Sequence, residues 1–84
     1  MSKGKTAAII LVQTEIGAET RVMEELLKIP EVKEVYIVYG TYDIVVKVEA
    51  EALEKVRDIV TNKIRRLPDI RTTVTMIVVE GRVK

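Results

Sequence analysis

Two apolar runs near the middle of the chain, residues 32–38 and 44–48, most constrain how it can fold. Both are rich in β-branched residues, which favour strands. Only the sequence YGTYD, residues 39–43, separates them. A glycine with polar neighbours and an acid between two such runs is typical of a hairpin. The sequence therefore predicts two antiparallel neighbouring strands that are joined at Gly40 and Thr41.

The other elements follow from the periodicity of the apolar residues. From Ala18 the apolar residues recur at helical spacing until Pro30, and the same spacing returns from Glu51 until Pro68. Each proline disfavours helix in the residue before it, so both helices are expected to end there. The predicted strands cover residues 6–14, 32–39, 42–49 and 70–79, and the predicted helices cover residues 18–29 and 51–67. The second helix is expected to place Leu53, Val56, Val60, Ile64 and Leu67 on one side.

The order β-α-β-β-α-β predicts a ferredoxin-like α+β fold, with a four-stranded antiparallel sheet and both helices on one face. A sheet with one face in water should alternate apolar and polar residues, but pairs such as Ile9-Ile10 place apolar side chains on both faces. About six to eight large aliphatic side chains would be exposed on the helix-free face, each worth roughly 1.5–3 kcal/mol when buried. We expect a homodimer that packs sheet against sheet. The alternative is a sheet so twisted that only its edges are exposed.

The composition narrows the possible functions. The 84 residues predict a single domain, residues 1–84, with a core over about residues 6–80. Histidine and cysteine are absent, so the commonest general base and metal ligands are missing, and we expect no enzyme activity, cofactor or metal. A net charge of +1, from 14 basic and 13 acidic residues, gives no reason to expect a nucleic acid partner. No apolar run is long enough for a membrane span or a secretion signal, so a cytoplasmic location is expected. The abundance of Glu, Lys, Arg, Ile and Val is typical of a thermophile.

Four landmarks, in consistent order and spacing, carry a family resemblance. They are PEV at residues 30–32, the G-x-x-D hairpin and its apolar continuation at residues 40–48, LPDI at residues 67–70, and TVT at residues 73–75. Over about residues 6–80 the sequence resembles the C-terminal effector domain, or RAM domain, of the leucine-responsive/asparagine (Lrp/AsnC) transcription regulators. Asp69 stands where that family usually has glycine. Family members usually carry an N-terminal helix-turn-helix domain, and only a few residues precede the first strand here, so a stand-alone effector domain is expected.

The resemblance implies that a small effector, typically an amino acid, binds between subunits near the G-x-x-D turn. The residues expected to contact it are Gly40, Thr41, Tyr42, Asp43, Thr73 and Thr75. Asp43 can accept a charge-assisted hydrogen bond from the ammonium group of an amino acid, and backbone N–H groups around Gly40 to Tyr42 can donate to its carboxylate. The competing interpretation is that the turn only reverses the chain, that Asp43 bonds to the backbone of the turn, and that the threonines are ordinary strand residues.

The resemblance also implies partners: a homodimer, a ring-like oligomer such as an octamer or decamer, and a full-length Lrp/AsnC regulator whose control of transcription the chain modulates. Two other classes share the predicted strand order. An ACT-type amino-acid-binding module assembles its sheets side by side, so an apolar helix-free face argues against it. A small enzyme is the other class. An acylphosphatase needs a phosphate-cradling loop with an arginine after the first strand, where residues 13–17 read QTEIG, and a dimeric α+β-barrel enzyme would have to work without histidine.

Overall fold

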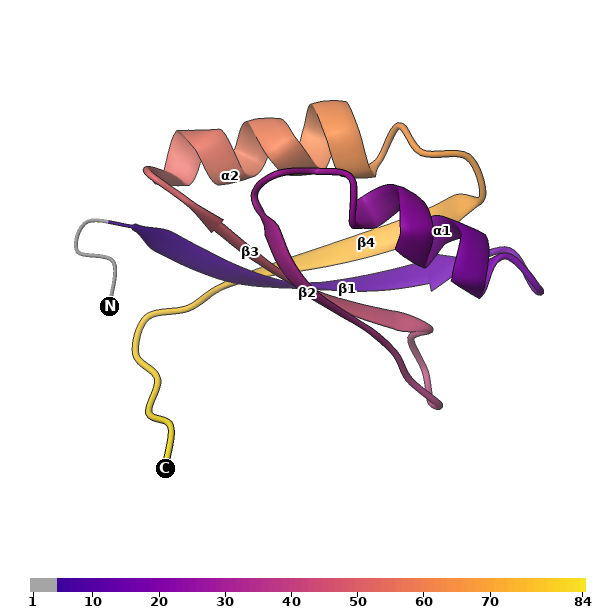
Figure 1. The fold of residues 1–84 in the computed structure, drawn as a ribbon, viewed down its shortest axis with the longest axis horizontal. Helices are drawn as coiled ribbons and strands as arrows, with labels where there is room; N and C mark the ends of the chain where they lie inside the picture. The colour runs from indigo at the N-terminus through magenta and orange to yellow at the C-terminus, as the bar shows by residue number, and fades with distance from the viewer. Residues whose placement is uncertain (1–4) are drawn as a thin grey trace.

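The structure is a computed structural model that describes residues 5–84, and it confirms the predicted order of elements. The strands are β1 (Thr6–Thr14), β2 (Val32–Ile37), β3 (Ile44–Ala50) and β4 (Ile70–Ile77). The helices are α1 (Glu19–Leu26) and α2 (Leu53–Ile59), and α2 runs directly into a π-helical turn, η1 (Val60–Ile64). The strands form one antiparallel sheet in the order β2-β3-β1-β4, and Figure 1 shows both helices over one face of it. The fold is therefore the ferredoxin-like α+β fold.

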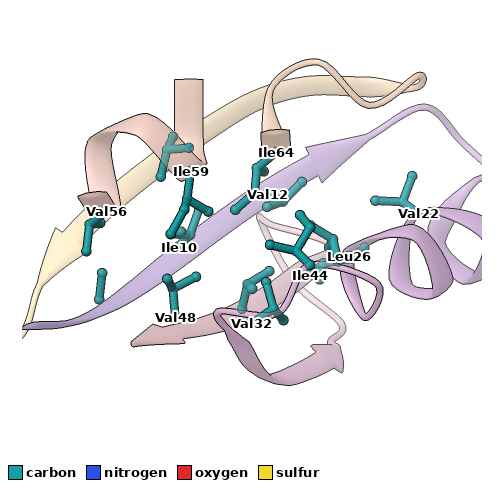
Figure 2. Close-up of a cluster of buried hydrophobic side chains, with 14 of the residues drawn as sticks. Ile10, Val12, Val22, Leu26, Val32, Ile44, Val48, Val56, Ile59 and Ile64 are labelled. Carbon is teal, nitrogen blue, oxygen red and sulfur yellow. The ribbon is translucent and has the colours of Figure 1, made fainter. Parts of the chain in front are cut away.

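The core lies between the sheet and the helices, and it is filled by every second residue of the two central strands, β1 and β3. The fully buried strand residues are Ala8, Ile10, Val12, Ile44, Val46 and Val48. Ile10 lies opposite Val46 in the ladder, so the two rows form one continuous apolar surface. The helices close this surface with Val22, Leu26, Val56, Ile59 and Ile64, which are drawn in Figure 2. Burial of such side chains, at about 1.5–3 kcal/mol each, is the main force that holds the two layers together.

The second helix differs from its predicted course. The N–H of Arg65 donates to the carbonyl oxygen of Val60 at 2.9 Å, five residues back instead of four. The wider turn rotates the chain by less per residue, which keeps Ile64 on the buried side. Ile59, absent from the predicted face, is fully buried, whereas Leu53 is 44% exposed. Leu53 lies in the first turn, over the edge of the sheet formed by β4, instead of over its centre.

The central hairpin also has a longer loop than predicted. β2 ends at Ile37 and β3 begins at Ile44, so residues 38–43 form the connection, and the N–H of Val38 donates to the carbonyl oxygen of Asp43 at 2.9 Å to close it. A two-residue hairpin turn requires positive φ at its first central position. Gly40 does not have a positive φ, in contrast to Gly17 with a φ of 86°. The loop thus reaches beyond the sheet instead of reversing at its edge.

The face of the sheet opposite the helices carries a row of apolar side chains. Across the four strands this row consists of Tyr36, Val45, Leu11 and Val74. A second row, formed by Glu34, Lys47, Ile9 and Met76, is polar toward β2 and apolar toward β4. We call these two rows the helix-free face. Tyr36, Val74 and Met76 are 53%, 37% and 43% exposed, so the outer strands present the most apolar surface, while Leu11 in a central strand is half-buried.

Over residues 5–84, the structure contains no helix that is long and apolar enough to cross a membrane.

Candidate functional site

The hairpin loop forms one wall of an open groove of about 570 Å³. The other wall is the first turn of α1. Its lining residues are Glu19, Thr20, Ile37, Val38, Tyr39, Gly40 and Asp43. The volume falls within the usual range for small-molecule sites, about 300–1,000 Å³. Two of the predicted contact residues, Gly40 and Asp43, therefore lie at a hollow large enough for an amino acid.

Asp43 is held by three hydrogen bonds to the ends of neighbouring strands. Its Oδ2 accepts from the backbone N–H of Thr14 at 2.9 Å, and its own N–H donates to the carbonyl oxygen of Val12 at 2.9 Å. The third is the bond from Val38 that closes the loop. Asp43 thus bonds to β1, across the sheet, through its side chain, whereas the competing interpretation placed that bond within the turn. Within residues 5–84 its Oδ1 accepts no hydrogen bond, so one carboxylate oxygen can still receive a donor.

The tip of the loop leaves backbone donors unused. The carbonyl oxygen of Thr41 accepts from Nε2 of Gln13 at 2.9 Å, which fixes the tip against the end of β1. The N–H groups of residues 40–42 donate to no other residue in the part of the chain that the structure describes. Tyr39 is fully exposed at the tip, and Tyr42 is half-buried. The loop therefore offers free backbone donors beside the carboxylate of Asp43.

The two threonines lie elsewhere. Thr73 pairs with Val12 and Thr75 with Ile10, so both belong to the side of β4 that faces the helices. Thr75 lines a shallow groove between β4 and α2, and Thr73 lines a polar hollow with Arg65 and other residues of β4. Strand β1 separates β4 from the hairpin strand β3. A single chain therefore does not bring the threonines to the groove that contains Asp43.

Glu19 and Thr20 were not predicted as site residues. They reach the groove because Gly17, with its positive φ of 86°, turns the chain from the end of β1 directly into α1. Ala18 occupies the N-cap position and makes no side-chain cap, so the first N–H groups of α1 lack that partner. The sequence signal for this wall is the short link that ends in glycine, residues 15–17, which places the start of the helix at the same end of the sheet as the hairpin loop.

The turn before β4 lies at this end of the sheet as well. Asp69 has a φ of 72°, a left-handed conformation that glycine adopts without strain and that other residues rarely adopt. Its carbonyl oxygen accepts from the N–H of Glu15 at 2.9 Å, and its Oδ2 lies 2.6 Å from Nη2 of Arg21. The hydrogen bond to Asp69 raises the pKa of Arg21 above its ordinary value. Asp69 thus keeps the positive φ of the turn. Its two contacts connect the turn to Glu15, just after β1, and to Arg21 in α1.

A second, larger groove of about 790 Å³ lies at the start of α2, and its lining is charged. Five acidic side chains and three lysines line it. Oε1 of Glu31 lies 3.8 Å from Nζ of Lys63 and is buried without a hydrogen bond. Among residues 5–84 no cluster of three or more acidic, histidine or cysteine side chains is placed to hold a metal ion. Acidic side chains outnumber lysines by two in this lining, so the groove does not favour an anionic ligand.

Comparison with known proteins places these features in a family. The family model for the Lrp/AsnC ligand binding domain matches residues 7–84. An HTH-type transcriptional regulator of Pyrococcus furiosus is 39% identical over 75 residues, which cover 86% of this chain and 50% of that protein. The chain spans about half the length of the curated relatives it matches.

Solved structures agree with the fold. A protein of Pyrococcus horikoshii is 49% identical, with a TM-score of 0.84 over 90% of this chain and 92% of that one. A transcriptional regulator of Neisseria meningitidis, solved as a complex with L-Met, has a TM-score of 0.82 over 94% of this chain and 53% of that one. At 15% identity this second likeness shows the fold alone.

Proposed function

Because this chain belongs to the Lrp/AsnC ligand binding domain family, we propose that it is a ligand-sensing and oligomerisation module that binds an amino acid at contacts between subunits. The observation that carries the proposal is the groove at the hairpin loop. There Oδ1 of Asp43 and the N–H groups of residues 40–42 all lack partners within residues 5–84. One anionic acceptor beside several donors matches the ammonium and carboxylate groups of a free amino acid.

The position of the threonines supports a site between subunits. Thr73 and Thr75 lie on β4, away from the groove, so they can contact a ligand at Asp43 only from a second chain. An open groove also leaves a small ligand exposed on one side, whereas tight sites bury most of a ligand's surface. A second subunit over the groove supplies the missing wall. The regulator of Neisseria meningitidis that shares this fold was solved with an amino acid, L-Met.

Dimerisation through the helix-free face is the second part of the proposal. The row Tyr36, Val45, Leu11 and Val74 runs across all four strands with no charged residue in it. At about 1.5–3 kcal/mol for full burial of each side chain, covering this row and Met76 stabilises a dimer substantially. With a two-fold axis between the two sheets, the same face is buried on both copies. In such an assembly, ligand binding shifts the equilibrium between oligomers only by its differential affinity for them.

A role in transcription follows from the relatives, which are HTH-type transcriptional regulators about twice as long as the matched segment. We propose that this chain modulates transcription or amino-acid metabolism by pairing with itself or with a full-length regulator through the helix-free face. Such pairing requires a comparable apolar face on the effector domain of the regulator.

The site is tested by isothermal calorimetry after a thermal-shift screen of the twenty amino acids. Asp43→Asn keeps a carbonyl oxygen for Thr14 and removes the charge, so it should weaken amino-acid binding by about tenfold or more while the fold is retained. Asp58→Asn on the exposed surface of α2 is the matched control and should leave affinity unchanged. Equal affinity in Asp43→Asn and the unsubstituted chain rejects Asp43 as a contact, and the absence of binding by every amino acid rejects this ligand class.

A further inference from the structure

The last residues of the chain, 78–84, form a C-terminal tail that leaves the sheet without folding back onto it. The N–H of Val78 donates to the carbonyl oxygen of Ala7 at 2.9 Å, and within residues 5–84 no later backbone group bonds to the sheet. Val79 is 96% exposed and Val83 is 99% exposed. Figure 1 shows the tail running away from the end of β4 on the side of the sheet opposite the helices. The tail therefore projects from the helix-free face.

The sequence of the tail has the pattern of a half-buried strand. In an extended chain, alternate residues point to opposite sides. One side of the tail carries Val79, Gly81 and Val83, and the other carries Glu80, Arg82 and Lys84. Such alternation indicates a segment with one side in water and the other against an apolar surface. The chain's own sheet does not supply that surface, since both valines are exposed. The family match extends to residue 84, so the tail belongs to the matched domain.

We propose that the tail is an exchange arm, which packs Val79 and Val83 against the helix-free face of a second copy of this chain. This inference rests on the proposed face-to-face dimer. Val78 lies opposite Ala7, one residue beyond Ile77, so alternation places it on the same side of the sheet as Met76. The chain bends at Val79 and leaves the sheet on the helix-free side, so the alternation of β4 does not continue into the tail. A second copy of this chain on that side is the partner that lies in the path of the tail.

The length of the tail fits this role. Residues 79–84, when extended, reach about 20 Å at roughly 3.3 Å per residue. The outer strands of a four-stranded sheet lie about 14 Å apart. The arm is therefore long enough to follow the margin of the partner's helix-free face that the sheet of the first copy leaves uncovered. The charged side of the arm carries one acid and two bases. The end of the helix-free face near β2 likewise carries an acid, Glu34, and a base, Lys47. Two-fold symmetry makes the exchange reciprocal, so each copy gives one arm and receives one.

The inference is tested by sedimentation analysis of the dimer in the full chain and in three altered chains. Deletion of residues 79–84, and the double substitution Val79→Asp with Val83→Asp, should each raise the dissociation constant at least about a hundredfold. Lys84→Ala, on the polar side of the same tail, should change it by less than about threefold. The core lies outside the tail, so the altered chains should keep the circular dichroism of the full chain.

Hydrogen exchange gives an independent measurement on the unaltered protein. The amides of residues 79–84 should be protected well above the dissociation constant of the dimer and should lose protection on dilution. Unprotected exchange of these amides in the dimer overturns the exchange arm. The same conclusion follows if the deleted chain dimerises as tightly as the full chain while Met76→Lys is monomeric, a result that leaves the dimer through the helix-free face standing. A full chain that is monomeric at every concentration overturns both proposals.

Discussion

Oδ2 of Asp43 accepts a hydrogen bond from the backbone N–H of Thr14 at 2.9 Å, across 29 residues of sequence. The bond lies just beyond the end of the pairing between β1 and β3, at Val12 and Ile44. The N–H of Thr14 therefore has no ladder partner in β3, and the carboxylate supplies an acceptor. The same side chain therefore completes the sheet with one oxygen, while within residues 5–84 the other oxygen has no hydrogen bond, in a residue that lines the groove. A structural role and a ligand role are compatible in Asp43.

This arrangement predicts different stabilities for two substitutions. Asp43→Ala leaves the N–H of Thr14, a residue only 5% exposed, without its acceptor, and should lower the free energy of unfolding by about 1–3 kcal/mol. Asp43→Asn should cost less, because its amide oxygen can still accept. Urea denaturation followed by circular dichroism measures both. Equal losses in the two variants would show that the charge, and not the hydrogen bond, stabilises the hairpin.

The sequence predicts the fold because the apolar period is a local property. The short apolar run of β1 and the helical spacing after Ala18 can be read from neighbouring residues alone, and the strand and the helix that they predict are present in the structure. The face occupied by Thr73 cannot be read in this way. It depends on pairing with Val12, and a shift of one residue in that ladder would move Thr73 to the other face. The positive φ of Asp69 was equally hidden, because it is set by bonds to distant residues.

The core offers a test with one residue type in two environments. Ile10 is completely buried between β3 and the helices, while Ile16 is 97% exposed in the β1–α1 link. Ile10→Ala should lower the free energy of unfolding by about 2–5 kcal/mol, because a cavity remains where the side chain was. Ile16→Ala should change it by no more than about 0.5 kcal/mol. Chemical denaturation of the two variants gives the comparison, and similar losses would contradict the burial pattern.

The left-handed conformation of Asp69 predicts that glycine is preferred to alanine at this position. Both substitutions remove the ion pair with Arg21, so their difference isolates the backbone conformation. Asp69→Gly should be about 1 kcal/mol more stable than Asp69→Ala, because a Cβ atom is strained at a φ of 72°. At Glu54, in the first turn of α2, the order should reverse, with alanine the more stable by roughly 0.5–1 kcal/mol. Thermal unfolding of the four variants tests both orders; the same order at both sites would argue against the strained turn.

The contact between Tyr36 and Glu34 on the helix-free face predicts that the stability of the fold falls at alkaline pH. Its hydroxyl group donates to Oε1 of Glu34 at 2.9 Å, and this bond, with the negative charge of Glu34, raises the pKa of Tyr36 above its ordinary value of 10.0. The neutral phenol is favoured in the folded state, so this contribution to stability is complete below pH 10.0 and is lost as the pH rises through the raised pKa.

Glu34→Gln should lower the pKa of Tyr36 toward the ordinary value. Absorbance near 295 nm, in a background in which Tyr39 and Tyr42 are replaced by phenylalanine, reports Tyr36 alone. A pKa that does not respond to Glu34→Gln would mean that another group controls the ionisation of Tyr36.

Met76 and Leu53 distinguish the two sides of the sheet as interaction surfaces. Their side chains are equally exposed, at 43% and 44%, but Met76 lies on the helix-free face and Leu53 lies on the helix side, beside β4. Met76→Lys places a charge beside Ile9 in the proposed dimer contact, where burial without a partner is costly. We expect it to raise the dissociation constant of the dimer by at least about a hundredfold, whereas Leu53→Lys should leave it unchanged. Light scattering over a range of concentrations measures both, and a dimer that survives Met76→Lys but not Leu53→Lys would move the interface to the helix side.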